Sequence, residues 1–93
     1  MIVTEKRLKN AFKYFCDNMK FRVATSLEDV GAYDLQKYQP GSKPFYRIVR
    51  VTENVGCEES TFGLENFTAK ELYEMMHFAV RVHRHVTAID YVP

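Results

Sequence analysis

One stretch of the chain, Phe67–Val86, carries both the start signal and the repeat of an amphipathic helix. Thr68 followed by Glu71 is a capping box, in which the threonine hydroxyl accepts from the glutamate amide and the glutamate carboxylate accepts from the threonine amide. Apolar residues then recur every three or four positions, which is the period of one helical face. This series is Leu72, Met75, Met76, Ala79 and Val80, with His83 at its end. Three further apolar residues widen the stripe: Phe78, Val82 and Val86. The pattern predicts a helix that is deeply buried against the rest of the chain.

A second amphipathic pattern covers Glu5–Lys20. Thr4 stands where an N-cap residue is expected, and a clean apolar stripe follows it. The stripe consists of Leu8, Ala11, Phe12, Phe15, Cys16 and Met19. Cys16 therefore lies on the apolar face, where we expect it to behave as a small hydrophobic residue.

Between the two helices, segments rich in β-branched and aromatic residues alternate with turn signals. We expect strands at Phe21–Leu27, Ala32–Gln39, Phe45–Thr52 and Cys57–Leu64. The segment Pro40–Pro44 predicts a hairpin turn, and Phe45–Thr52 is the expected central strand because both of its faces are partly apolar. The β-rich segment Thr87–Pro93 leaves three alternatives open: a further strand, an arm exchanged in a dimer, or a frayed end.

The order helix, three or four antiparallel strands, helix predicts an α+β fold built as a two-layer sandwich. Because each helix has an apolar stripe, we expect both helices on one face of the sheet and an open second face. With 93 residues and no dividing linker, the chain is expected to form a single domain over residues 1–93.

The residues with metal-binding or catalytic chemistry do not form a motif. His77, His83 and His85 are separated by six, eight and two positions, so no pair has the helical spacing of metal ligands. The sequence contains no nucleophile elbow, no H-E-x-x-H and no glycine-rich phosphate loop. We therefore expect no enzymatic activity, no metal and no cofactor. No stretch has the character of a signal peptide or of a membrane span, so a cytoplasmic location is expected.

Tyrosine and arginine are concentrated in the predicted strands, and both residue types are enriched at protein-binding hot spots. The expected contact face consists of Tyr33, Tyr38, Tyr46, Ile48 and Arg50. We expect a small, non-catalytic interaction or regulatory module that binds another protein or a second copy of itself. Its size is also typical of the inhibitors that phages and mobile elements direct against host complexes.

An alternative function is nucleic-acid binding. The order of elements is similar to that of the double-stranded-RNA-binding domain, but that family presents clustered lysines at the start of its second helix. This chain has a mixed set there: Glu65, Asn66, Lys70 and Glu71. The alternative therefore uses the basic face of the first helix and the residue after it, because lysine and arginine can follow a phosphate backbone. These residues are Lys6, Lys9, Lys13, Lys20 and Arg22.

Overall fold

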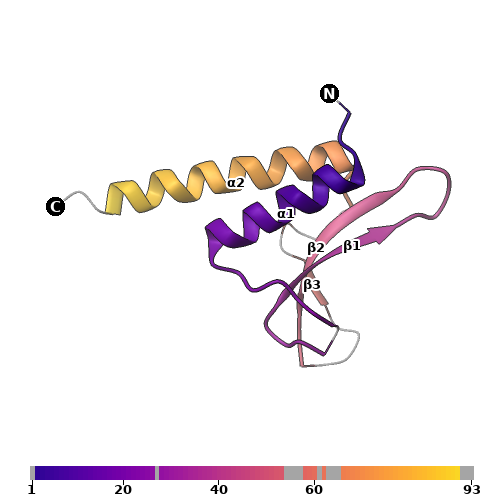
Figure 1. Cartoon of the computed structure of the whole chain (residues 1–93), viewed down its shortest axis with the longest axis horizontal. Coiled ribbons are helices and arrows are strands. Elements are labelled where there is room, and N and C mark those ends of the chain that lie inside the picture. The colour runs from indigo at the N-terminus through magenta and orange to yellow at the C-terminus, as the bar shows by residue number, and fades with distance from the viewer. Residues whose placement is uncertain (1, 27, 54–57, 61, 63–65, 91–93) are drawn as a thin grey trace.

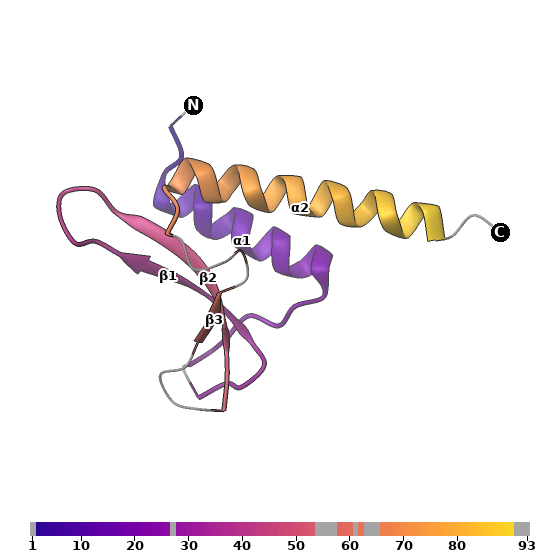
Figure 2. The same cartoon turned by 180° about the vertical axis from the view of Figure 1, so that it is seen from behind.

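The computed structural model describes residues 2–26, 28–53, 58–60, 62 and 66–90. The elements follow one another as α1 (Glu5–Met19), β1 (Tyr33–Tyr38), β2 (Phe45–Val51), β3 (Glu58–Ser60) and α2 (Ala69–Asp90). The two helices lie side by side, and the strands run beneath them in both views (Figure 1, Figure 2). The prediction of an α+β fold is confirmed.

The strands form an antiparallel sheet with β2 between β1 and β3. β1 pairs with β2 from Tyr33 opposite Arg50 to Tyr38 opposite Phe45, and β3 pairs with the other edge of β2 over its three residues. The hairpin turn expected at Pro40–Pro44 joins β1 to β2. β2 thus lies between the other two described strands, whereas much of the predicted strand 57–64 lies outside the described residues.

Helix α1 begins and ends as its sequence predicts. The Thr4 hydroxyl accepts from the Arg7 amide at 3.1 Å. At the other end Lys20 takes the left-handed conformation, with φ of 62°. The predicted apolar face is buried except for Met19, which is partly buried, and Cys16 is only 1% exposed. Burial raises the pKa of the Cys16 thiol to about 11, because the thiolate would lose its hydration.

Helix α2 starts with the predicted capping box. The Thr68 amide donates to Glu71 Oε1 at 3.0 Å, and the Glu71 amide donates to Thr68 Oγ1 at 3.3 Å. The helix then continues to Asp90. The alternative of a further strand is therefore wrong for residues 87–90, and residues 91–93 lie outside the described part of the chain. No proline or glycine interrupts the helix before Asp90, and β-branched residues reduce helix propensity only slightly.

The two apolar sets of α2 lie on different faces of the helix. Leu72, Met76 and Val80 are 0%, 1% and 3% exposed and pack in the core with α1. The widened stripe is exposed instead, at 61% for Phe78, 44% for Val82 and 50% for Val86. Each residue advances by about 100° around a helix, so Phe78 lies about 200° away from Met76. The prediction that all of these residues are buried is wrong, since one face of the helix meets the core and a different face meets solvent.

The strand predicted at Phe21–Leu27 is also wrong. Among the described residues of this segment only Val23 makes a β-bridge, which is an isolated one with Tyr33. The segment instead closes into a loop around Asp29, whose carboxylate accepts from the Thr25 amide at 3.3 Å. A side chain that accepts a hydrogen bond from a backbone amide competes with strand pairing for that amide.

The same loop is held by an arginine. The Arg22 guanidinium binds the Asp29 carboxylate and donates to the Val30 carbonyl at 3.0 Å. The hydrogen bond from Arg22 to the Asp29 carboxylate is the main reason why the pKa of the Asp29 carboxyl lies below its usual range. The chain then turns at Gly31, with φ of 87°, a conformation that glycine adopts without strain.

Candidate functional site

The register of the hairpin decides which side chains share a face. Directly paired residues of an antiparallel sheet point to the same side, so Lys37 and Tyr46 share one face with Leu35 and Ile48. Tyr46 and Ile48 belong to the core cluster that includes residues of both helices. We call the side with Gln36, Tyr38, Phe45 and Arg47 the outer face of the hairpin.

The predicted contact residues do not form one open surface. Tyr46 is 4% exposed and Ile48 is 1% exposed, so the expectation that they face a partner is wrong. The reason is a backbone contact: Tyr46 and Phe67 exchange two hydrogen bonds, of 2.7 and 2.9 Å. These bonds tie the strand to the segment that enters α2, and the side chains beside them are covered by the helices.

The other three predicted residues are separated along the hairpin. Tyr33 is half-buried and stacks on Phe21 with 4.0 Å between ring centroids. Arg50 is exposed and pairs with Tyr33, at the opposite end of the hairpin from Tyr38. Only Tyr38, which is 55% exposed, lies on the outer face.

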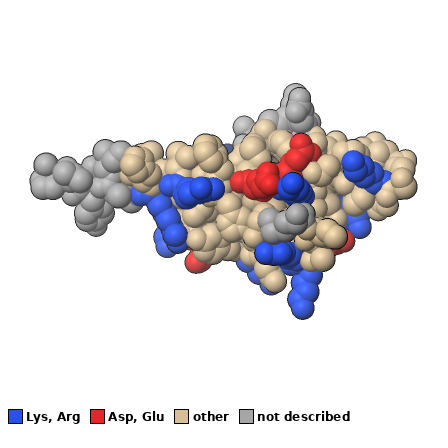
Figure 3. Space-filling model, turned by 90° about the horizontal axis from the view of Figure 1, so that it is seen from above, with Lys and Arg blue, Asp and Glu red and all other residues tan. Residues whose placement is uncertain are grey.

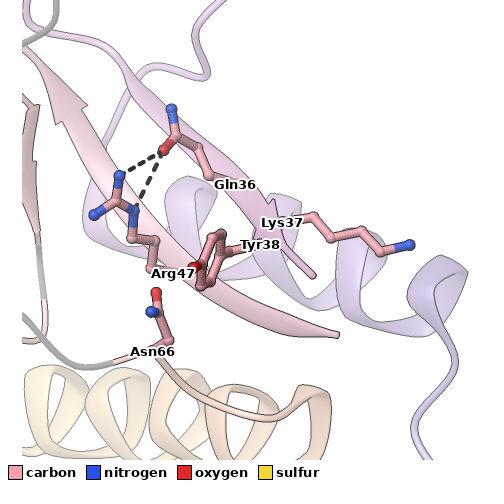
Figure 4. Close-up of a pocket in the computed structure, with 5 residues that line it drawn as sticks. All are labelled: Gln36, Lys37, Tyr38, Arg47 and Asn66. Atoms are coloured by element: carbon pink, nitrogen blue, oxygen red, sulfur yellow. Dashed lines mark hydrogen bonds between the residues drawn. The ribbon is translucent and has the colours of Figure 1, made fainter. Parts of the chain in front are cut away.

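The outer face carries a shallow hollow of about 490 Å³. It is lined by Gln36, Lys37, Tyr38, Arg47 and Asn66 (Figure 4). Arg47 donates from Nε and Nη2 to Gln36 Oε1, at 3.3 and 3.1 Å, and these two bonds orient the guanidinium. In Figure 4 Lys37 points away from the other four side chains, and its Nζ lies 3.2 Å from Glu5 Oε2 on α1. The hollow therefore combines an oriented guanidinium with an exposed phenol ring and an amide.

The basic face of α1 is present but only partly available. Lys6, Lys9 and Lys13 are all exposed, although Lys9 Nζ lies 3.5 Å from Glu5 Oε1. Lys37 and, to a smaller extent, Lys9 lower the pKa of the Glu5 carboxyl. The remaining two predicted residues have structural roles, since Lys20 caps α1 and Arg22 holds the loop described above. Seen from the side of the helices, basic side chains form separate groups rather than one band (Figure 3).

Aromatic rings line the seam between the two helices, a feature that helical periodicity alone does not predict. The His77 ring lies 4.4 Å from the Tyr73 ring and 5.8 Å from the Tyr14 ring. The Arg7 guanidinium lies over Tyr73 at 5.5 Å, and that of Arg84 lies over Tyr14 at 5.7 Å. His77 is thus engaged in packing. Within the described residues, no three His, Cys, Asp or Glu side chains come together as a metal site would require.

A second surface lies on the side of α2 that faces away from the core. We call it the α2 outer stripe, and its residues are Met75, Phe78, Val82 and Val86. Beside its N-terminal half is a second hollow, of about 330 Å³. The hollow is lined by Phe67, Glu71, Glu74, Met75 and Phe78. The spacing of four between Phe78, Val82 and Val86 was the available signal for this surface, because it is offset by two from the buried series.

A search with this chain against protein families, curated proteins and solved structures gives no match. In the part of the chain that the structure describes, no helix has both the length and the apolar composition needed to cross a membrane. The two surfaces are therefore the basis for a functional proposal.

Proposed function

We propose that this chain is a small, non-catalytic module that binds a partner protein through the outer face of its hairpin. The observation that carries the proposal is the exposed Tyr38 ring beside the oriented Arg47 guanidinium. Tyrosine and arginine supply much of the binding energy at protein interfaces, because each combines a flat contact surface with hydrogen-bond donors. In this proposal the sheet and the helices are two layers of a sandwich, and the helices cover only the inner face.

The chemistry of the hollow defines the kind of partner. An oriented guanidinium donates well to a carboxylate or to backbone carbonyls, and the Asn66 amide adds both a donor and an acceptor. The phenol ring of Tyr38 offers an apolar surface next to these groups. We therefore expect the partner to present an acidic or polar segment that also carries an apolar side chain.

Site-specific photo-crosslinking tests this proposal. A photoreactive phenylalanine analogue replaces Tyr38 in one preparation and Val30 in a control preparation. Val30 is 46% exposed, so both positions are accessible. We expect position 38 to crosslink a defined partner in extracts of the source cell and position 30 not to do so.

The captured partner then allows a quantitative test. Tyr38→Ala should weaken its binding by about thirtyfold, the effect of a hot-spot residue worth about 2 kcal/mol. Arg47→Ala should weaken binding as well, whereas Val30→Ala should leave it unchanged. Equal crosslinking at the two positions, or unchanged affinity in Tyr38→Ala, would show that the outer face is not the binding surface.

The alternative function, nucleic-acid binding through α1, is favoured by the three exposed lysines on one helical face. Three phosphate contacts predict that the logarithm of the affinity falls with the logarithm of salt concentration with a slope of about −2.7 for duplex DNA. The double variant Lys9→Glu/Lys13→Glu should abolish such binding, with Lys43→Glu in the hairpin turn as the control. Absence of any binding at low salt would exclude this alternative.

A further inference from the structure

We propose that the α2 outer stripe binds a second copy of this chain, with the two α2 helices antiparallel and a two-fold axis passing near Phe78. This interface shares no residue with the outer face of the hairpin. A dimer of this form would leave both hairpins free for the partner proposed above. The inference does not depend on that proposed function, because a different surface and different observations support it.

The first argument is the apolar character of the stripe. Phe78 is 61% exposed, and Val82 and Val86 are about half exposed, so the stripe is a row of apolar side chains in solvent. With Met75 the spacing is three, four and four, which keeps all four residues on one side of the helix. The C-terminal end of α2, beyond the Arg84 side chain that donates to Asn18 of α1, also extends past the end of α1 (Figure 1), so a second helix can approach it there.

The second argument is the position of the charges. Glu74 and Arg81 are seven residues apart, which is two helical turns, so they lie on the same flank of the stripe. In an antiparallel pair of identical helices, each flank faces the same flank of the other copy, and positions equally far from the axis meet. An axis close to Phe78, which is four residues after Glu74 and three before Arg81, therefore places Glu74 near Arg81 of the second copy, and Arg81 near its Glu74. Among the described residues, neither side chain forms an ion pair within its own chain.

The same axis brings together side chains of matching shape. Met75 meets Val82 of the second copy, and the Phe78 rings of the two chains meet at the axis. The hollow of about 330 Å³ lies on the N-terminal side of Phe78, and the projecting Val82 lies on the C-terminal side. Each copy thus supplies a hollow where the other supplies a projecting side chain. In the space-filling view over the helices, an acidic group lies between basic groups on a largely uncharged surface (Figure 3).

A parallel arrangement lacks this complementarity. Parallel helices place opposite flanks in contact, so Glu74 would face the flank of Ala79 instead of Arg81. Two helices alone form a contact at the low end of the size range of specific interfaces. We therefore expect a dimer that dissociates on dilution rather than a permanent one.

Sedimentation equilibrium of the full chain, over a dilution series from the millimolar to the low micromolar range, tests the proposal. The wild type should pass from dimer to monomer across the series. Phe78→Asp should remain monomeric throughout, because the substitution places two carboxylates at the two-fold axis. Phe78 is exposed in the monomer, so the variant should keep the far-ultraviolet circular dichroism of the wild type. Val30→Asp is the matched control, an apolar-to-acidic change at an exposed position outside the stripe, and it should dimerise as the wild type does.

A charge exchange tests the antiparallel register. Arg81→Glu alone replaces two attractive contacts per dimer by two repulsive ones and should weaken dimerisation at least about tenfold. The double variant Glu74→Arg/Arg81→Glu restores both contacts and should recover the wild-type dissociation constant. A wild type that is monomeric at every concentration, or a Phe78→Asp variant that still dimerises, would overturn the proposed interface. A double variant weaker than Arg81→Glu would overturn the antiparallel register.

Discussion

The sequence pattern predicts Ile48 on an open face of the sheet, whereas the structure buries it. Substitution of Ile48 tests this burial through its effect on stability. Ile48 is 1% exposed and packs in the core cluster with Leu72 and Met76. Ile48→Ala removes three carbon atoms, which is about 2.4 kcal/mol of transfer free energy at about 0.8 kcal/mol per buried methylene. Incomplete collapse of the cavity adds to this, so we expect a total loss of about 3 kcal/mol in the free energy of unfolding.

Urea unfolding followed by far-ultraviolet circular dichroism measures this loss, since two helices dominate the signal and the chain has no tryptophan. For a chain of this size, an m-value of about 1.5 kcal/mol per molar urea converts 3 kcal/mol into a fall of about 2 M in the midpoint. The whole domain is expected to be stable by roughly 5 to 14 kcal/mol, so the variant should still fold.

The control is Ile2→Ala, which makes the same chemical change at a side chain that is 87% exposed. We expect this control to change the unfolding free energy by less than about 0.5 kcal/mol. If Ile48→Ala were as mild as Ile2→Ala, the inner face of β2 would not be covered by the helices. The assignment of the outer face of the hairpin would then also be wrong, because the two faces are defined by the same register.

Three further predictions concern a helix cap, a buried thiol and a set of three carboxylates. Thr68→Ala should lower the unfolding free energy by about 1 kcal/mol through loss of the N-cap, which urea unfolding will measure; an unchanged midpoint would contradict the capping role. Cys16, with its raised pKa, should react with iodoacetamide at pH 8 far more slowly in the folded chain than in urea, as peptide mass mapping will show; equal rates would contradict its burial. Glu5, Asp29 and Glu71 have lowered pKa values in the fold, so they stabilise it above the ordinary carboxyl pKa near 4. That stabilisation should be lost as pH falls through the lowered values, and a urea midpoint that does not drop between pH 6 and pH 3 would contradict this reading.

The starts of the two helices and the hairpin turn were predictable because local chemistry determines them. The capping box at Thr68 and Glu71 involves residues three positions apart, and each satisfies a backbone amide of the other. The hairpin turn follows from Pro40 and Gly41 in the same local way. Features of this kind need no knowledge of the rest of the fold.

The face of β2 that meets the helices was not predictable from its own residues. Phe45, Val49 and Val51 on one side are about as apolar as Tyr46 and Ile48 on the other. The backbone bridge between Tyr46 and Phe67, which are far apart in the sequence, ties one side to the helices. Val49 and Val51 on the other side are also buried, at 0% and 3% exposed, but lie outside the core cluster formed with the helices. A one-residue change of register would exchange the two faces, so a contact of this kind decides which tyrosines remain exposed.

In α2, by contrast, the sequence does contain the pattern that separates the buried residues from the exposed ones. The prediction missed it because it joined the two sets of apolar residues into one stripe. Positions 72, 76 and 80 and positions 78, 82 and 86 are two series with a period of four, and their centres lie about 120° apart around the helix, so they occupy two different faces. A helix that packs on one side of a small fold can bury only one such series. The second series therefore either exposes apolar side chains to water, which is unfavourable, or is covered by another chain in an assembly. Glu74 and Arg81, four residues before and three residues after Phe78, favour a second copy of the chain as that cover, because their charges meet only when two α2 helices pack in opposite directions.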